Sequence, residues 1–447
     1  MLQTFKNAWK VPELRKKILF TLMIILLYRI GATLPVPFVN LDHPQFNSEV
    51  SSLMSGGLFE FMGMLSGNAF SQATFFALSV SPYITSSIVM QLLTIAIPPL
   101  ERLSKDEMGK KKIASATRWV TVGLALITAY GYVNILDATG KATGTAMIKH
   151  DGVNDFFAWT VMIACFCAGA SLIMWLAEKI NDHGIGNGIS MILFANILSG
   201  GASAVMALVN MVTVAGKANG AWGYVLGAVE VVISLAVALA AVVLVVWFTN
   251  SERRIKVVYA KKVVGRKMYG GQKTNLPLKM NMAGVMPVIF ASSIVSIPAT
   301  IAAFFQGSAF ADFVTAWLSQ TSPIYIVVFI ALIFAFSYFY IAISFNPVEV
   351  ANNIRSNGGA IIGIRPQEMA PFIKKILNRV TLMGAVFLVV IAATPMIVNA
   401  IVTVAGGNFT SVAFAGTSLL IVVGVALETV RDLEAQLSMR NYKGFLD

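Results

Sequence analysis

Few residues in this 447-residue chain have the types and spacing that catalysis or metal binding requires. The three histidines, His43, His150 and His183, are far apart, and the chain contains no G-x-x-x-x-G-K-[ST], H-E-x-x-H or G-x-S-x-G motif. The two cysteines, Cys165 and Cys167, lie in an apolar run and indicate neither a disulfide framework nor a metal site. We therefore predict no enzymatic activity, no cofactor and no bound metal.

Two charged residues, Arg29 and Glu230, fall inside apolar stretches. A charge near the bilayer centre costs at least ~2.5 kcal/mol, so such residues are usually paired or functional. Arg29 fits equally well a role in transport and a structural role, with its guanidinium bonded to backbone carbonyls or reaching the interface. A proton-coupled transporter would carry several acids in its spans, whereas this chain carries few.

The composition is that of a polytopic membrane protein. The chain is 57% hydrophobic and 12% charged, with a mean hydropathy of +0.76, whereas soluble domains are about 25% charged. Apolar stretches long enough to cross a bilayer as helices predict ten spans: 18–36, 74–96, 117–136, 156–177, 186–208, 223–248, 284–305, 322–345, 377–398 and 408–428.

The positive charges alternate with these spans. Of the 33 Lys and Arg residues, 29 fall in the termini and in the loops on one side, and three fall in the loops on the other side. Cytoplasmic loops carry the excess of Lys and Arg in membrane proteins. We therefore predict that both termini are cytoplasmic. A miscounted span would also have disrupted the alternation, so the asymmetry supports the number ten.

The stretch Ser55–Leu93 differs from the other predicted spans. No Lys or Arg occurs between Arg29 and Arg102, which indicates that the stretch lies in the bilayer or beyond it. Its first part is too short to span and is rich in glycine, with Gly56, Gly57, Gly63 and Gly67. A short apolar segment of this kind is tolerated in a membrane only when protein buries it or when it lines a cavity. This pattern favours a movable element beside a pore or cavity, as in a channel or a transporter.

Ten spans divide into two groups of five, which must enter the membrane in opposite orientations as an inverted repeat. We predict an all-α fold with an N-terminal half at 1–209, a C-terminal half at 210–428, a hinge loop at 209–222 and a cytoplasmic tail at 429–447. Spans 2 and 7 share the pattern P-x-I-x-x-S, at Pro82–Ser87 and at Pro287–Ser292. Each is the second span of its half, so the two spans should lie close together.

Two loops on the predicted cytoplasmic side are unusual. Residues 249–283 hold nine Lys and Arg against the single acid Glu252, and their glycines predict a projecting hairpin. Residues 346–376 form a second long loop. Basic cytoplasmic loops can serve topology alone. Nine positive charges exceed that need, which favours an acidic partner such as RNA or an acidic protein face.

Ordered motifs along nearly the whole chain, from Pro12 to the Tyr442–Phe445 tail, carry a family resemblance. They are Tyr28-Arg29-Ile30-Gly31, the glycine-rich segment before Ser81-Pro82-Tyr83-Ile84, Gly184–Ser190, Gly265–Gly271, Asn281–Pro287, Asn346-Pro347 and Gly363-Ile364-Arg365-Pro366. Together they resemble the bacterial SecY family, whose members form the central subunit of the protein-conducting channel. The resemblance implies two five-span halves around an hourglass pore that opens laterally between spans 2 and 7.

The resemblance also implies a pore constriction made of aliphatic side chains. The positions that correspond to this ring are Val80, Ile84, Ile189, Leu193, Ile289 and Ile421. The pairs 80/84 and 189/193 are spaced i,i+4, so each pair shares one helix face. An aliphatic ring can exclude water and hinder ions while it yields to an extended polypeptide.

Three further sets of residues take roles from the family. The plug consists of Gly57, Leu58, Phe59, Glu60, Phe61, Met62, Gly63, Met64, Leu65, Ser66 and Gly67. The lateral gate includes Ser86, Ser87, Gln91, Ser292 and Ser293. The ribosome and the motor ATPase SecA bind the cytoplasmic loops, at Arg253, Arg254, Lys261, Lys262, Arg266 and Arg365.

The implied function is passage of unfolded secretory proteins across the bacterial inner membrane and lateral release of membrane-protein helices. The implied partners are SecE, SecG, SecA, the ribosome, signal peptides with their nascent chains, and membrane lipids. A secondary transporter of a small solute is the alternative, but it would place polar groups near the midplane, where this chain has aliphatic residues. An intramembrane enzyme is a third class, and the chain has no motif for it.

Overall fold

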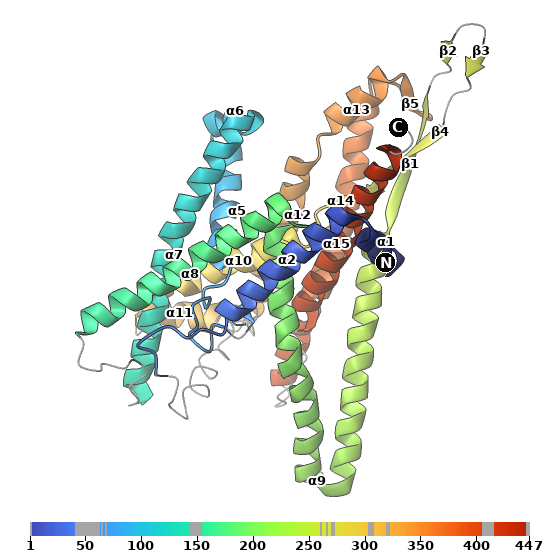
Figure 1. Cartoon of the computed structure of the whole chain (residues 1–447). Helices are drawn as coiled ribbons and strands as arrows, with labels where there is room; N and C mark the ends of the chain where they lie inside the picture. Colours follow the sequence, from blue (N-terminus) through green and yellow to red (C-terminus); the bar gives the residue numbers. More distant parts are fainter. Residues whose placement is uncertain are drawn as a thin grey trace.

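The computed structural model describes residues 2–40, 63, 66–67, 69–143, 148, 154–259, 262–264, 267–269, 273–302, 308–318, 322–404 and 415–443. Within these ranges the chain is a bundle of long helices with a small β-structure at one end, here called the sheet end (Figure 1). The helices are α1 (Leu2–Lys10), α2 (Pro12–Gly31), α5 (Ser81–Ala96), α6 (Pro98–Lys105), α7 (Glu107–Thr143), α8 (Asp155–His183), α9 (Gly188–Asn250), α10 (Met286–Ala302), α11 (Ala309–Trp317), α12 (Pro323–Ser344), α13 (Pro347–Ser356), α14 (Met369–Val404) and α15 (Ala415–Lys443).

Several helices are long and apolar enough to cross a bilayer. Among the described residues there are five: Glu107–Ala138, Asp155–His183, Gly227–Asn250, Pro323–Ser356 and Met369–Thr394. The pair α5 and α6, bent by 105° at its break, would add a sixth, and Gly188–Gly201 and Met286–Pro298 are shorter apolar helices. The protein is therefore a multi-pass membrane protein, while the number ten stays a prediction.

Two sequence-based boundaries are wrong. The span predicted at 74–96 becomes helical only at Ser81, because Ala73 (φ 46°) and Ser79 (φ 51°) take left-handed backbone conformations that interrupt a right-handed helix. Residues 209–222, predicted as a loop, are helical, since α9 runs from Gly188 to Asn250. Figure 1 shows that α9 folds back on itself as two arms that meet at the end opposite the sheet.

One large hydrophobic cluster, here called the central cluster, fills the middle of the bundle. Its buried side chains come from α2, α5, α8, α9, α10, α12, α14, α15 and the turns before α5. Tyr28 and Phe329 are among its largest fully buried members. Helices α5 and α10 contact each other, so the predicted proximity of spans 2 and 7 is confirmed.

The two unusual loops form one folded unit. Strand β1 (Glu252–Tyr259) pairs with β4 (Lys273–Lys279) in an antiparallel hairpin, as predicted, and β2 (Lys262–Val264) pairs with β3 (Lys267–Tyr269) towards its tip. The other edge of β1 pairs with β5 (Gly359–Ile361), which belongs to the second loop. This pairing was not predicted. Buried side chains from β1, β4, β5, α13 and α14 give the unit its own core: Ile255, Val257, Leu278, Ala351, Ile354, Ile361, Met369 and Ile373.

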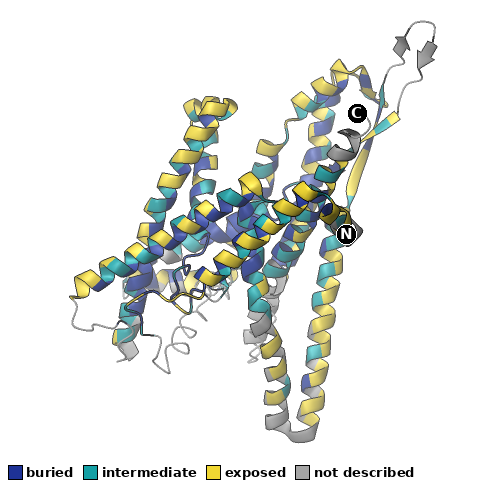
Figure 2. Cartoon of the chain, viewed as in Figure 1, coloured by how far each residue is buried: buried dark blue, intermediate teal, exposed yellow. Residues whose placement is uncertain are grey.

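The second arm of α9 is largely exposed (Figure 2), and many of its exposed residues are apolar. Val232, Leu239 and Trp247 are 65%, 66% and 71% exposed, and only 6% of the apolar window in Gly227–Asn250 is buried. A helix with so little protein cover and such high apolarity fits contact with lipid. The exposed arm thus agrees with a membrane location.

Candidate functional site

The six residues predicted to form the ring all join the central cluster. Five of them are buried there, namely Val80, Ile84, Leu193, Ile289 and Ile421, each at most 2% exposed. Ile189 is half-buried and packs against the same cluster. They come from the start of α5, the start of α9, α10 and α15, that is, from both predicted halves. Whether they act as a pore ring stays a prediction, but they are packed together.

Local sequence determines where α9 and α5 begin, and so where their predicted ring residues lie. The side chain of Asn187 caps α9 by accepting hydrogen bonds from the backbone N–H groups of Ile189 (3.0 Å) and Ser190 (3.5 Å). Gly188 lets α9 start against α8, because a Cβ there would lie 2.0 Å from the carbonyl oxygen of Ala177. Pro82, in the first turn of α5, favours a helix start next to Val80. Capping and close approach therefore fix where the aliphatic side chains point.

A second close approach brings α15 to the start of α10. A Cβ at Gly424 would lie 2.5 Å from Cγ1 of Val285. Gly424 follows Ile421 by about one turn and Val285 precedes Ile289 by the same distance. The contact therefore sets the spacing between the two helices that carry Ile289 and Ile421.

A cavity of about 580 Å³ lies next to these residues. It reaches the starts of α9 and α10 and the part of α15 that follows Ile421. Its lining is largely polar: Gly186, Asn187, Thr249, Lys279, Asn281, Met282, Gly284, Val285, Gly424, Glu428, Arg431 and Asp432. The cavity borders the central cluster at Val285.

Side chains of α15 line this cavity and hold both ends of α9. The Arg431 guanidinium donates to the carbonyl oxygen of Thr249 and to Oδ1 of Asn250, both at 2.8 Å. Asp432 Oδ2 accepts from the backbone N–H of Gly186 at 3.1 Å. Burial, and the positive charge of Arg431, lower the pKa of Lys279.

Only three residues of the predicted plug lie in the described part of the chain: Gly63, Ser66 and Gly67. The Ser66 hydroxyl, fully buried, donates to the carbonyl of Gly63 (3.0 Å) and accepts from the N–H of Phe70 (3.1 Å). Gly67 has φ +61° and lies against the backbone of α9. The remaining eight lie outside the described residues: Gly57, Leu58, Phe59, Glu60, Phe61, Met62, Met64 and Leu65.

The predicted lateral-gate residues use their polar groups within single helices or within one half. Ser292 and Ser293 donate to the carbonyl of Ile289 at 2.9 and 2.8 Å, in their own helix. Gln91, which is exposed, donates to the Ser87 hydroxyl at 3.4 Å. These hydrogen bonds lie within α5 and within α10, and the two helices also contact each other.

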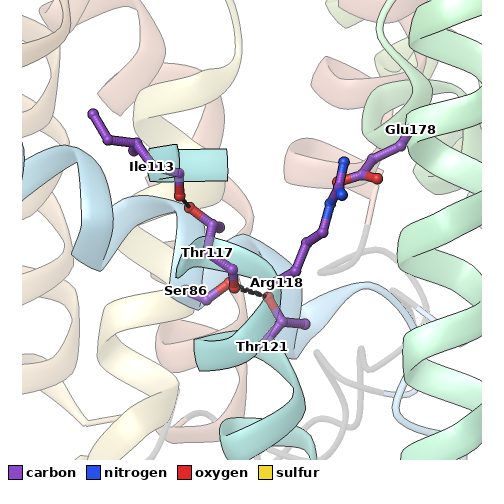
Figure 3. A network of polar contacts seen from close by, with 6 residues as sticks. All are labelled: Ser86, Ile113, Thr117, Arg118, Thr121 and Glu178. Carbon is purple, nitrogen blue, oxygen red and sulfur yellow. Dashed lines mark hydrogen bonds and ion pairs between the residues drawn. The ribbon is translucent and has the colours of Figure 1, made fainter. Parts of the chain in front are cut away.

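Ser86 instead belongs to a polar network that joins α5 to α7 (Figure 3). Its buried hydroxyl lies 2.5 Å from the hydroxyl of Thr121, which donates to the Thr117 carbonyl at 2.7 Å. Beside it, Arg118 Nε lies 2.9 Å from Glu178 Oε1 and ties α7 to α8. Sequence reasoning missed this network. The i,i+4 spacing of Thr117 and Thr121 was visible, but their partner on α5 was not.

Four of the six predicted partner-binding residues lie in the described β-structure or in the turn after β5. Arg253 and Arg254 are exposed on β1, and Arg254 lies 3.6 Å from Glu252. Arg365 is exposed in the turn after β5, so the β1–β5 pairing brings it into the same unit. Lys262 lies in β2. The other two, Lys261 and Arg266, lie outside the described residues.

The Ser86–Thr121 contact should be energetically coupled. Thr121→Val removes one partner of a buried hydroxyl, and we expect it to lower the free energy of unfolding by about 1 kcal/mol. Ser86→Ala with Thr121→Val should cost less than the sum of the single changes. Denaturant unfolding in detergent measures this. Thr128→Val is the control, because Thr128 donates only to carbonyls of its own helix. Strict additivity would contradict the coupling.

Comparisons with known proteins agree with this geometry. The SecY family model matches residues 74–430. The protein translocase subunit SecY of Streptomyces galbus is 43% identical over the whole of both chains. A solved SecY structure, described in terms of a plug domain that stabilises the closed channel, superposes with a TM-score of 0.63 at 18% identity, over 96% of each chain. Canine Sec61 from a ribosome–channel complex superposes with a TM-score of 0.55 at 16% identity, also over 96% of each chain. The chain belongs to the SecY family.

Proposed function

We propose that this chain is the central pore-forming subunit of a Sec translocon. It passes unfolded secretory proteins across the membrane and releases membrane-protein helices laterally into the bilayer. The observation that carries the proposal is the packing of six aliphatic side chains from both predicted halves into the central cluster, which borders a cavity of about 580 Å³ at Val285. Relatives of the same length are named translocase subunits.

The chain acts as a conduit and not as an enzyme. The seal offers aliphatic side chains, which make no specific hydrogen bond to a passing polypeptide. A small-solute transporter would instead need polar groups converging on the solute. Energy for transport comes from partners.

The sheet end faces the cytoplasm of a bacterial cell, and both termini lie on that side of the inner membrane. The distribution of Lys and Arg supports this orientation, with 29 of 33 on one side. The unit built from β1, β4, β5 and α13 then projects from the membrane as one body. Signal peptides and nascent chains enter through the polar cavity beneath it.

This unit is the docking surface for the ribosome and for SecA. Its support is structural: pairing of β1 with β5 joins two loops about a hundred residues apart in the sequence, and the shared core holds Arg253, Arg254 and Arg365 on one body. Basic side chains that face RNA phosphates bind with an affinity that falls steeply as salt rises. A Sec61 relative occurs in a ribosome–channel complex.

An apolar groove between α2, α9 and α15 is the seat of the SecE helix, and SecG binds at the periphery. The groove has a volume of about 470 Å³ and is lined by Ile18, Thr21, Leu22, Ile185, Met191, Phe194, Val246, Val422, Val423, Val425, Ala426, Leu427, Thr429, Val430 and Leu433. It contacts helices of both predicted halves, so a helix seated there would clamp them. Membrane lipids cover the exposed arm of α9.

Charge reversal at β1 tests the ribosome surface. The double change Arg253→Glu and Arg254→Glu should weaken ribosome binding at low salt and reduce the salt slope by about two. Binding of ribosomes to the reconstituted channel at several salt concentrations measures both. Lys141→Glu, at the far end of α7 with its side chain 77% exposed, is the control. Equal affinity of the variant and the wild type at low salt would leave topology as the only role of these arginines.

Filling the apolar groove tests the SecE seat. Ala426→Trp places a large ring in the groove, so a SecE chain should be lost during purification of the complex. The stoichiometry of co-purified SecE gives the result. Ala240→Trp, on the exposed arm of α9, adds the same ring where lipid can accommodate it. If both variants retain SecE in full, the groove is not its seat.

Polar substitution in the aliphatic cluster tests the seal. Ile84→Asn or Ile289→Asn should hydrate the constriction, favour the open state and relax the demand for a good signal sequence. Deletion of 58–66 should loosen the seal without abolishing transport, because neighbouring residues can substitute. Ion conductance of the purified complex in planar bilayers measures the seal. Resting conductance at the wild-type level in all these variants would rule out this gate.

A further inference from the structure

One polar residue of α9 lies beside the six predicted ring residues, here called the aliphatic cluster (Val80, Ile84, Ile189, Leu193, Ile289 and Ile421). Asn196 is fully buried, and it follows Ile189 and Leu193 at i+7 and i+3. The three residues therefore share one face of the helix. A buried amide surrounded by apolar side chains is costly unless it is hydrogen-bonded. The hydrogen-bond partner of the Asn196 amide therefore indicates the role of this residue.

The amide of Asn196 holds the residue that precedes Val80. Its Nδ2 donates to the hydroxyl of Ser79 at 3.4 Å, across 117 positions in the sequence. Ser79 has φ +51°, a left-handed conformation that is unfavourable for a residue with a Cβ. Such strain persists only where surrounding contacts impose it. The bond from Asn196 is one such contact, and Val80 enters the aliphatic cluster immediately after this turn.

Tyr28 of α2 lies beside Asn196 and Ser79. It is fully buried, its ring stacks on Phe76 with centroids 5.2 Å apart, and its hydroxyl faces the side chains of Asn196 and Ser79. Phe76 also lies in the turn segment before α5. Helix α2 thus packs against the part of the protein in which Asn196 and Ser79 are hydrogen-bonded.

The backbone of Asn196 is in contact with the end of the predicted plug. A Cβ at Gly67 would lie 2.9 Å from the Asn196 carbonyl oxygen and 3.2 Å from its Cα, and Gly67 has φ +61°. Both the space and the backbone conformation therefore require glycine. Three residues beyond Gly67, the carbonyl of Phe70 accepts a hydrogen bond from the Tyr132 hydroxyl at 2.5 Å.

We propose that Asn196 is a positioning residue of the gate. Its side chain holds the strained turn at Ser79 so that Val80 packs into the aliphatic cluster, and its backbone is the seat on which Gly67 rests. The inference rests on the proposed function, because it assumes that this cluster is the seal. Through this one residue, α9 positions both Val80 in the constriction and Gly67 at the end of the predicted plug.

The proposal predicts a leak with a specific rescue. Asn196→Ala should raise the resting ion conductance of the purified complex about fivefold, the effect expected from one lost hydrogen bond. It should also allow export of a client with a defective signal sequence. Adding Ser79→Gly should restore the tight state, because glycine adopts φ +51° without help. Ser79→Gly alone, which removes the hydroxyl that the Asn196 amide holds, is the reference from which the effect of Asn196→Ala in the double variant is measured.

A second variant independently tests the contact between Gly67 and the backbone of Asn196. Gly67→Ala should also raise the resting conductance, because its Cβ would press on the Asn196 carbonyl. Gly123→Ala on α7, where a Cβ meets nothing within 4 Å, should remain tight. Ile84→Asn serves as the reference for a leaking constriction.

The outcomes separate this inference from the function on which it rests. A leak in Ile84→Asn with tight Asn196→Ala and Gly67→Ala would overturn the role of Asn196 and leave the gate in place. A leak in Asn196→Ala that Ser79→Gly does not repair would overturn the route through Ser79. If Ile84→Asn is itself tight, the aliphatic seal and the inference built on it both fail.

Discussion

The structure depends on apolar packing among the helices that form the central cluster. At the middle of the bundle, Ile84, Leu193, Ile289 and Ile421 meet through contacts that have no direction and no specific partner. Each contact is weak, and together they exclude water. In the proposed function the helices part and close again along this surface, and apolar contacts can be lost and formed again without a specific partner. The hydroxyls of Ser292 and Ser293, bonded within their own helix, leave the seam apolar.

Irregular backbone next to this seam is satisfied inside the protein. Residues 69–80 are not helical, and in a membrane their N–H and C=O groups need internal partners. Phe75 N–H donates to the Leu34 carbonyl at 2.8 Å, and Val36 N–H donates to the Ala73 carbonyl at 3.2 Å. These bonds join the segment to the chain that follows α2. A segment fixed in this way can aim Val80 at the cluster.

The sheet end is linked to the same region through covalent and polar connections. Strand β4 leads through Gly284, at φ +63°, into α10, which carries Ile289. Arg431 and Asp432 of α15 grip the two ends of α9 beside the polar cavity. In the proposed function, a partner that binds the sheet acts on a body that is continuous along the chain with α9 and α10.

The sequence by itself determined the membrane class and the basic hairpin at 249–283, because hydropathy, charge and glycine spacing are local properties of the chain. The proximity of spans 2 and 7 followed instead from the division of the ten predicted spans into two groups of five and from the shared P-x-I-x-x-S pattern. It also supported a family resemblance that the comparisons confirmed. Only the tertiary structure decided the start of α5, the pairing of β1 with β5 and the contacts of Ser86 and Asn196. Each of these depends on a partner far along the chain: Thr121 for Ser86 and Ser79 for Asn196. Spacing within one helix shows which residues share a face, but not which helix that face meets.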